Sequence, residues 1–416
     1  MNNNRQIDTD NLRLIVFDSA KELGEKVNEK LLKQYRLDPE KYTFIVPINQ
    51  LFFEDGHLKV EIKETVRGKD IFMLTDIGNY SLEYKMHGLI NHTSPNDLVT
   101  QLKDGIGACN CHAKSINVIM PLLYCGRQHR RNTREHLSCG AMLYDLDRIH
   151  TVKSFITFDA HDEGVEHAIH NTEFDNVFPT NVILEDLIND LPVDRLKNMV
   201  FVAPDNGATG RRNVYLNSFG TEYVHKEAGS FVKQRDYNTL IDGKYPVIAH
   251  EYCGYDNLEG YTAIITDDMI SSGQSILDVA EELKKHGVEH SYVVVTYALF
   301  TKGIDKFQKA VDEGKIDGIY TTNLSYIPEE YKKKEWIHIC DCSDLMADLI
   351  YNIHNDLSIS KLLHDKSLPI KLIKEKFERE KRKEEEAQQE VQEQQEVVKT
   401  KTLSKKMGTR KKEIVK

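Results

Sequence analysis

The stretch from Tyr261 to Asp278, YTAIITDDMISSGQSILD, constrains the fold of this chain more than any other. An apolar run over 263–265 predicts a short buried strand, and the carboxylates of Asp267 and Asp268 follow at its end. A loop of small and polar residues leads from there into an amphipathic helix. The loop residues are Ser271, Ser272, Gly273, Gln274 and Ser275. This order predicts an α/β fold in which backbone N–H groups and the helix dipole bind an anion such as phosphate.

The two carboxylates in this stretch predict a second contact. Asp267 and Asp268 cannot bind a phosphate, but they can accept hydrogen bonds from vicinal hydroxyls or hold a divalent metal. A phosphate on one side and a diol on the other describe a ribose phosphate. The same spacing also fits an ordinary strand-to-helix turn in which the aspartates only cap the helix. Both interpretations stay open on the residues alone.

Length, charge and cysteine content narrow the class of protein. The 416 residues are enough for two or three domains, and the net charge of −11 argues against general nucleic-acid binding. No run approaches the length of a membrane span, and we expect no signal peptide and no membrane contact. The 7 cysteines are scattered and form no disulfide framework, which favours a reduced, cytoplasmic setting.

Short apolar runs separated by amphipathic segments recur along most of the chain, and this alternation predicts a doubly wound α/β architecture. The predicted strands include 12–17, 70–74, 117–123, 154–158 and 200–203. A turn signal at 53–57 followed by strict alternation over 58–62 predicts a hairpin. We divide the chain into an N-terminal domain over 9–177, a C-terminal domain over 178–370 and a tail over 371–416.

Polar side chains gather where several predicted strands end, which is where open α/β sheets bind ligands. Arg127 and Gln128 belong to a cluster of cationic and amide side chains that could bind a polyphosphate or a nucleotide base. The alternative is a solvated basic loop that binds no ligand. His161 stands between two carboxylates and is a candidate metal ligand or acid–base group, or a surface histidine in a polar turn. Asp205 follows the strand over 200–203.

Two segments carry little hydrophobic pattern. The segment 225–260 is predicted to be a long irregular flap, on which Lys233 and Arg235 could close over a phosphoryl group that is being transferred. An exposed charged loop is the alternative. The tail from residue 371 is almost free of large apolar residues, so we predict a mobile or helical, charge-paired appendage that buries no core.

The central stretch resembles the ribose-phosphate-binding loop of the phosphoribosyltransferase superfamily, an acidic pair followed by a Thr/Gly-rich turn. Over about 12–355 the chain resembles one branch of that fold, the ribose-phosphate pyrophosphokinases, also called phosphoribosyl pyrophosphate synthetases. The motifs that match are Phe53-x-Asp55-Gly56, Arg127-Gln128, Asp159-x-His161, Pro204-Asp205 and Lys233-x-Arg235. The chain departs from the family pattern at His57, His129 and Tyr297, among other positions.

The resemblance implies two tandem phosphoribosyltransferase-like domains and transfer of the diphosphoryl group of ATP to the C1 hydroxyl of ribose 5-phosphate. It implies Mg²⁺ as cofactor and a dimer-based homo-oligomer, up to a hexamer. The implied site residues are Lys233, Arg235 and His161 in catalysis; Asp267, Asp268 and Ser271 to Ser275 for ribose 5-phosphate; Phe53, Asp55, Arg127 and Gln128 for ATP; and His161 and Asp205 for the metal. A non-catalytic regulatory homologue and a phosphoribosyltransferase remain as alternatives.

Overall fold

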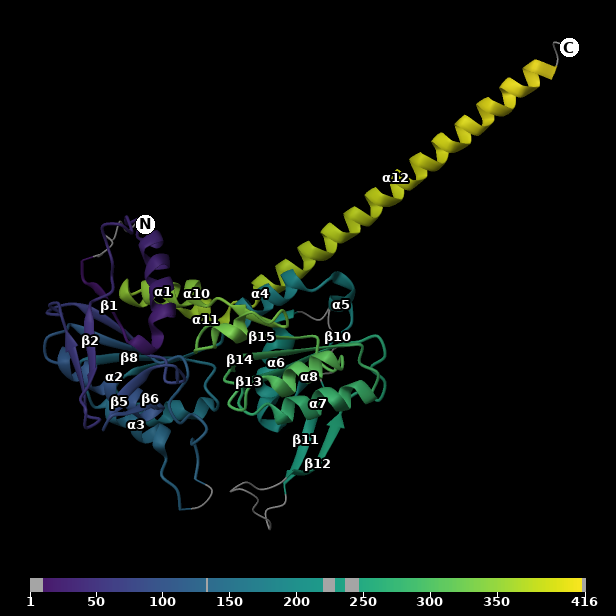
Figure 1. The fold of residues 1–416 in the computed structure, drawn as a ribbon. Coiled ribbons are helices and arrows are strands. Elements are labelled where there is room, and N and C mark those ends of the chain that lie inside the picture. The colour runs from purple at the N-terminus through teal and green to yellow at the C-terminus, as the bar shows by residue number, and fades with distance from the viewer. Residues whose placement is uncertain (1–9, 132–133, 220–228, 236–246, 414–416) are drawn as a thin grey trace.

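The computed structural model describes residues 10–131, 134–219, 229–235 and 247–413. Two α/β units lie side by side, and one long helix extends away from them (Figure 1). None of the helices in this described part of the chain is both long enough and apolar enough to cross a membrane.

The N-terminal unit is built on five parallel strands, and the predicted strand pattern is confirmed. In spatial order these are β1 (Leu12–Val16), β4 (Asp70–Leu74), β7 (Ser115–Ile119), β8 (Val152–Phe158) and β9 (Glu173–Val177). One face packs on α2 (Pro95–Cys109) and α3 (Ser138–Asp147), and the other on α1 (Lys21–Gln34). Helices on both faces explain why a strand such as β4 is buried along its whole length.

The C-terminal unit is built on seven strands, of which only the outermost pair is antiparallel. In spatial order these are β12 (Val247–Cys253), β11 (Gly229–Arg235), β10 (Met199–Ala203), β13 (Thr262–Ile270), β14 (His290–Ala298), β15 (Gly318–Thr322) and β16 (Ile337–Cys340). The helices α7 (Gln274–Lys285) and α8 (Asp305–Asp312) cover one face, and α4 (Thr180–Asp190) and α6 (Thr209–Phe219) the other. The doubly wound α/β fold is therefore confirmed in both units.

Shorter elements complete the fold. They are the hairpins β2 (Ile48–Phe52) with β3 (Leu58–Ile62) and β5 (Glu83–Met86) with β6 (Leu89–His92), the helices α5 (Val193–Lys197), α9 (Glu329–Lys332) and α11 (Ser360–His364), and the 3₁₀ turns η1 (Asp18–Ala20), η2 (Glu163–Ala168) and η3 (Asn206–Ala208). The hairpin predicted over 53–62 is confirmed as the turn between β2 and β3.

The C-terminal part of the chain returns to the N-terminal sheet. Helix α10 (Ser343–His354) packs beside α1, and its Met346 and Ile350 join the buried cluster on that face (Figure 1). His354 at its end contacts the buried Asp70 at 2.7 Å between Nδ1 and Oδ2. The predicted boundary at 177/178 falls between β9 and α4. The division into domains stays a prediction, but α10 belongs spatially with the other unit.

The prediction of an irregular segment over 225–260 is wrong for two parts of it. Strands β11 and β12 pair antiparallel from Ser230 opposite Cys253 to Arg235 opposite Val247. Aromatic and β-branched residues such as Phe231 occur on both strands and favour extended backbone, and Phe231 is buried in the core of the unit. Residues 225–228 and 236–246 of this segment lie outside the described part of the chain.

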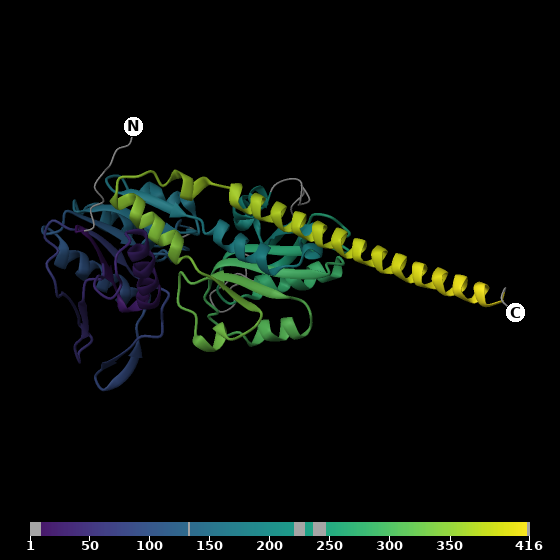
Figure 2. The ribbon, with the colours of Figure 1, turned by 90° about the horizontal axis from the view of Figure 1, so that it is seen from above.

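The tail forms α12 (Ser367–Glu413), a helix of 47 residues that is about 70 Å long at ~1.5 Å per residue. Both views show it projecting from the body (Figures 1 and 2). The prediction that the chain buries nothing from residue 371 onward is wrong for the first turns, because Ile373 is fully buried and Phe377 packs on the same cluster. Their spacing of four residues puts both on one helix face. Residues 381–390 are exposed, as predicted.

Candidate active site

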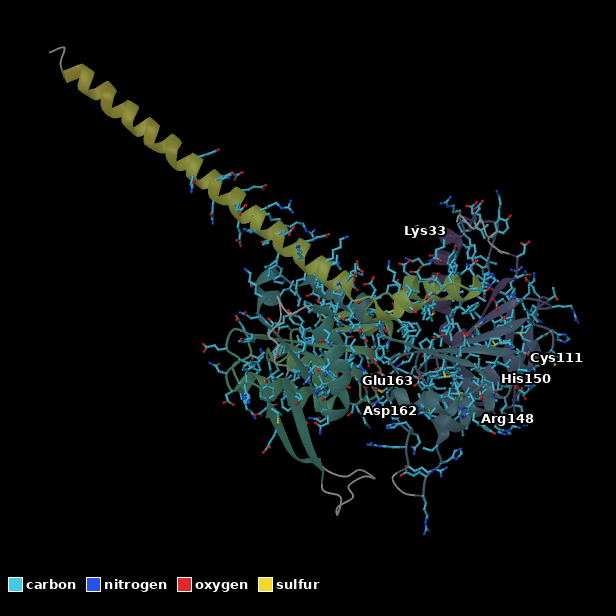
Figure 3. The ribbon with its side chains drawn as sticks, turned by 180° about the vertical axis from the view of Figure 1, so that it is seen from behind. Lys33, Cys111, Arg148, His150, Asp162 and Glu163 are labelled. Atoms are coloured by element: carbon cyan, nitrogen blue, oxygen red, sulfur yellow. The ribbon has the colours of Figure 1, made fainter. Side chains whose placement is uncertain are left out.

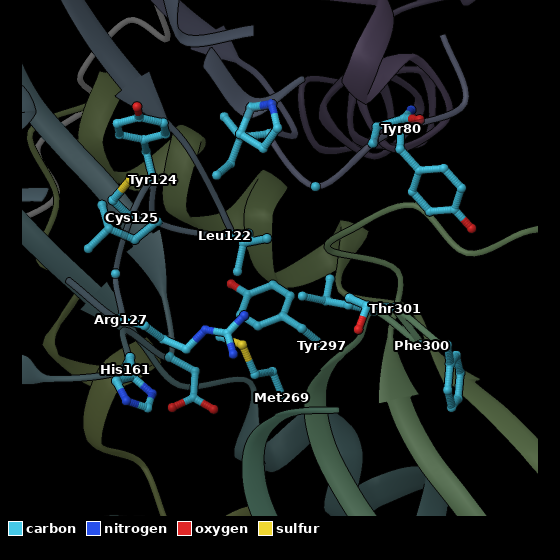
Figure 4. A pocket seen from close by; sticks show the side chains of 18 of the residues that line it. Tyr80, Leu122, Tyr124, Cys125, Arg127, His161, Met269, Tyr297, Phe300 and Thr301 are labelled. Atoms are coloured by element: carbon cyan, nitrogen blue, oxygen red, sulfur yellow. The ribbon is translucent and has the colours of Figure 1, made fainter. Parts of the chain in front are cut away.

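A cavity of about 780 Å³ lies between the two units. Loops that follow β4, β7 and β8 form one wall, and the ends of β13 and β14 form the other. The side chain of Arg127 reaches into this cavity beside His161 and Tyr297 (Figure 4). Parallel strands place their carboxyl ends at one edge of each sheet, so the polar strand ends singled out in the sequence can meet here.

The loop 271–275 is shaped to leave backbone N–H groups available. Gly273 adopts φ +75° at the N-cap of α7, and a Cβ there would lie 2.2 Å from the ring of Phe307. Only glycine meets both conditions without strain. No side chain caps the first turn of α7, so the dipole and N–H groups at this helix end remain suited to a phosphate.

A cation that the sequence analysis missed lies beside this loop. Lys306 on α8 donates from Nζ to Gln274 Oε1 at 3.0 Å, and Gln274 Nε2 donates to Asp278 Oδ1 at 2.8 Å. The side chain of Gln274 is therefore held on the outer side of the helix end, between two charged groups. The signal was present in the sequence only as an exposed lysine in another helix, and only the packing of α8 beside α7 brings it here.

Asp267 and Asp268 lie inside β13, near its carboxyl end. The prediction that they follow the end of a shorter strand is therefore wrong. The strand continues because Asp267 pairs with Val295 and Ile270 pairs with Ala298 of β14. The side chain of Asp268 is 3% exposed, and its Oδ2 accepts a hydrogen bond at 2.6 Å from Nδ1 of His161.

The two neighbouring carboxyls differ in their ionisation. Burial alone raises the pKa of Asp268, but the hydrogen bond with His161 and the charge of Arg211 bring this pKa below its ordinary value. Burial and the Asp268 carboxylate raise the pKa of Asp267 well above the ordinary value, and the charge of Asp205 adds to this. Asp268 is thus an ionised partner of His161, whereas the charge of Arg211 lowers the pKa of Asp267 by less than burial and the Asp268 carboxylate raise it.

A second contact, the ion pair between Asp159 and Arg211, also joins the two units. Asp159 directly follows β8 and has φ +43°, and its Oδ1 accepts a hydrogen bond from Nε of Arg211 on α6 at 2.6 Å. Its other oxygen accepts from Thr296 Oγ1 of β14 at 2.6 Å. Sequence analysis noted Asp159 but missed Arg211 and Thr296. The available signal was helical spacing, since Arg211 begins the stripe that continues with the buried Tyr215 and Phe219.

Tyr297 joins the units at the floor of the cavity. Its hydroxyl oxygen lies 2.5 Å from the carbonyl oxygen of Pro121 and 2.7 Å from that of Phe158, so one donated hydrogen is shared between the two. Pro121 follows β7 and Phe158 ends β8, both in the N-terminal unit. The tyrosine therefore has a structural role here that explains a bulky residue at this position.

The remaining predicted residues fall into separate groups. Asp205 follows β10, and its Oδ1 accepts from the N–H groups of Gly207 at 3.0 Å and Ala208 at 3.3 Å. Gln128 donates to Glu135 at 2.9 Å in the loop that carries Arg127. The rear view places Asp162, which follows His161, at the junction of the units (Figure 3).

Phe53 and Asp55 do not lie with the other predicted nucleotide ligands. They occupy the turn between β2 and β3, where Phe53 is 51% exposed and Asp55 contacts His57 at 3.0 Å. Neither residue lines the cavity that Arg127 lines. Lys233 and Arg235 belong to β11, beside β10 and its Asp205, and their side chains lie outside the described part of the structure.

Comparison with known proteins adds independent findings. A family model described as the N-terminal domain of ribose phosphate pyrophosphokinase matches residues 12–148, and one described as the phosphoribosyl synthetase-associated domain matches residues 254–364. Together they cover more than half of the chain.

Two relatives and a solved structure match most of the chain. Ribose-phosphate pyrophosphokinase of Haemophilus influenzae is 24% identical over 85% of this chain and 99% of its own length. The same-named protein of Mycoplasmopsis pulmonis is 24% identical over 76% of this chain and 88% of its own. A structure of phosphoribosylpyrophosphate synthetase from Mycobacterium smegmatis, 21% identical, matches with a TM-score of 0.65 over 83% of this chain and 99% of that one.

Proposed function

The chain belongs to the ribose-phosphate pyrophosphokinase family of enzymes, and from this premise we propose that it transfers the diphosphoryl group of ATP to the C1 hydroxyl of ribose 5-phosphate. The products are phosphoribosyl pyrophosphate and AMP. One observation carries the proposal: the acidic pair beside the phosphate loop of the C-terminal sheet is joined to His161 of the N-terminal unit through a bond of 2.6 Å. A sugar phosphate and a nucleotide held by different units would meet at that bond.

The sugar phosphate is assigned to the C-terminal unit. The 5-phosphate would be held by Ser271, Ser272, Gly273, Gln274 and Ser275 at the N-terminus of α7. Asp267 and Asp268 would accept hydrogen bonds from the ribose hydroxyls. Because Asp268 already accepts from His161, we assign the larger share of the diol contact to Asp267.

The nucleotide is assigned to the opposite wall. Arg127 and Gln128 would bind ATP from the loop after β7, and Lys233 and Arg235 would stabilise the charge that develops on the transferring group. Phe53 and Asp55 do not line the cavity that Arg127 lines, and they would reach a nucleotide bound by a neighbouring copy. This assignment needs a homo-oligomer, which accords with the family expectation.

The residues present fit a divalent cation such as Mg²⁺. Asp267 has a raised pKa because it is buried beside other carboxylates, one of them Asp205, and a cation there would restore its charge. His161 and Asp205 are the proposed protein contacts. Among the described residues no three metal-ligating side chains are grouped together. We propose that substrate phosphates would supply the remaining ligands. When bound, the metal would neutralise phosphate charge.

An assay with the full chain tests this proposal. Incubation with ribose 5-phosphate, ATP and magnesium should release AMP together with phosphoribosyl pyrophosphate in equal amounts. Binding of both substrates without turnover would point to a regulatory homologue instead. Consumption of added phosphoribosyl pyrophosphate with a nucleobase, and no AMP from ATP, would point to a phosphoribosyltransferase.

Removing either cation of β11 is expected to lower kcat about 10²-fold, since one preorganised cation at a transition state is typically worth that much. The variants are Lys233→Ala and Arg235→Ala, measured by AMP release and by thermal unfolding. Lys309→Ala on the exposed face of α8 serves as the control and should retain full activity. Wild-type kcat in both β11 variants would exclude these residues from the reaction.

Ser275→Ala should weaken binding of ribose 5-phosphate by about 1 kcal/mol, or up to ~3 if its hydroxyl bonds the charged phosphate. The backbone N–H groups of the loop still meet the phosphate, so affinity should fall but not disappear. Isothermal titration calorimetry with ribose 5-phosphate measures the change, and Ser291→Ala, a buried serine at the amino end of β14, is the control. Equal affinity in wild type and Ser275→Ala would place the phosphate elsewhere.

A further inference from the structure

The side chain of Arg211 lies at the point where three elements of the C-terminal unit meet one turn of the N-terminal unit. It is 9% exposed and contacts Oδ1 of Asp159 through Nε and Nη2, each at 2.6 Å. Nη2 also lies 3.5 Å from the carbonyl oxygen of Ala160. One guanidinium therefore holds two successive residues of the turn that leads to His161.

This turn needs to be held. Asp159 has φ +43°, a left-handed conformation that is strained for a residue other than glycine. Such a conformation persists when surrounding contacts over-determine it. Arg211 fixes one carboxylate oxygen of Asp159, and Thr296 fixes the other at 2.6 Å.

The turn sets the position of His161. This residue follows Asp159 by two positions, and its Nδ1 lies 2.6 Å from Oδ2 of Asp268 on β13. A shift of the turn relative to the C-terminal sheet would lengthen this bond. The contacts of Asp159 with α6 and β14, and of His161 with β13, tie the same short segment to three elements of the other unit.

We propose that Arg211 is a positioning residue of this active site, which holds the Asp159–His161 turn against the C-terminal sheet so that His161 meets Asp268. The kinetic part of this inference rests on the proposed function. The planar guanidinium suits the role because it can bond a carboxylate and a neighbouring carbonyl in one orientation, which a lysine ammonium cannot do.

The test compares Arg211→Met and Arg211→Lys with Arg195→Met. Arg195 is a suitable control because it is also partly buried, donates to the hydroxyl of Tyr292 and lies over the Tyr292 ring. Its partner Tyr292 is near the amino end of β14, whereas Thr296 and Tyr297 near the site are toward the carboxyl end. We expect Arg211→Met to lower kcat ten- to hundred-fold, in accord with the ~10²-fold cost of a misplacement of about 1 Å. The KM for ribose 5-phosphate should stay within about two-fold, and Arg211→Lys should fall between Arg211→Met and wild type.

A second measurement does not depend on the reaction. In protein labelled with ¹⁵N-histidine, the Nδ1 proton of His161 should resonate far downfield because of its short bond to Asp268, and the assignment follows from its absence in His161→Gln. Arg211→Met and Arg211→Lys should shift or broaden this signal, and Arg195→Met should leave it unchanged. This readout tests the inference even if the enzyme proves to catalyse a different reaction.

Three results would overturn the inference. An unchanged His161 signal in folded Arg211→Met would show that the turn is held without the arginine. A large rise in KM with the signal unchanged would make Arg211 a direct substrate ligand. If Arg211→Met does not fold, an unchanged signal and wild-type kcat in Arg211→Lys would exclude the positioning role, because lysine cannot reproduce both contacts.

Discussion

Replacing Asp268 by asparagine is expected to lower kcat about 10³-fold with little change in the fold. The carboxylate is buried, ionised and bonded to Nδ1 of His161 at 2.6 Å, so it fixes the orientation and tautomer of that ring. Where a buried aspartate orients a catalytic histidine, the amide costs up to ~10⁴ in kcat because it favours the wrong tautomer. We expect a smaller loss here, since charge neutralisation and positioning contribute more to phosphoryl transfer than proton transfer does.

Asp267→Asn is the matched control for this prediction. It makes the same change one residue earlier on β13. Because the pKa of Asp267 is raised, the neutral amide resembles the protonated carboxyl that is favoured when no cation is bound. We expect it to weaken apparent affinity for ribose 5-phosphate and for magnesium, with a smaller loss of kcat than Asp268→Asn. Steady-state kinetics over both substrates and magnesium separate these effects. Equal kcat losses in the two variants would contradict the different roles assigned to the two aspartates.

The parts of the fold that were predicted correctly depend on local pattern. Strands such as β4 and β14 are buried on both faces, so they occur as short runs of apolar residues that need no partner to be recognised. The β2–β3 hairpin was predicted from a Gly56 turn and strict alternation. The packing of α10 on the N-terminal sheet could not be predicted in this way, because no local signal states which sheet an amphipathic helix will cover.

The same limit applies to the site. The loop 271–275 and the acidic pair are contiguous in sequence, and their geometry follows from a strand, a glycine turn and a helix end. The bond between His161 and Asp268 joins residues 107 positions apart, and the bond between Asp159 and Arg211 spans 52. Each partner alone is only a polar residue near a strand end. Tertiary packing selects which of many such residues meet.

The tail gives the second large effect, and it reverses the expectation from composition. Truncation after Leu372 removes the buried Ile373, the packed Phe377 and Lys376, whose Nζ lies within hydrogen-bond distance of the carbonyl oxygens of Ile188 and Leu191 at the end of α4. Loss of a buried isoleucine alone typically costs ~2–5 kcal/mol. We therefore expect this truncation to destabilise the C-terminal unit by at least about 3 kcal/mol.

Truncation after Glu380 is the control, because residues 381–390 are all exposed and no charge-paired helix of this kind stabilises a core. Thermal unfolding of both truncated chains and the full chain decides the matter. The shorter chain should unfold at a Tm at least about 6–12 °C below that of the full chain, since about 3 kcal/mol is lost and each kcal/mol corresponds to ~2–4 °C for a unit of this size. The longer chain should match the full chain in Tm and in activity. A loss of Tm in both truncated chains would mean that the projecting part of α12 is itself packed. If the longer truncated chain eluted from a size-exclusion column at a smaller apparent size than the full chain, the projecting part of α12 would be an assembly helix.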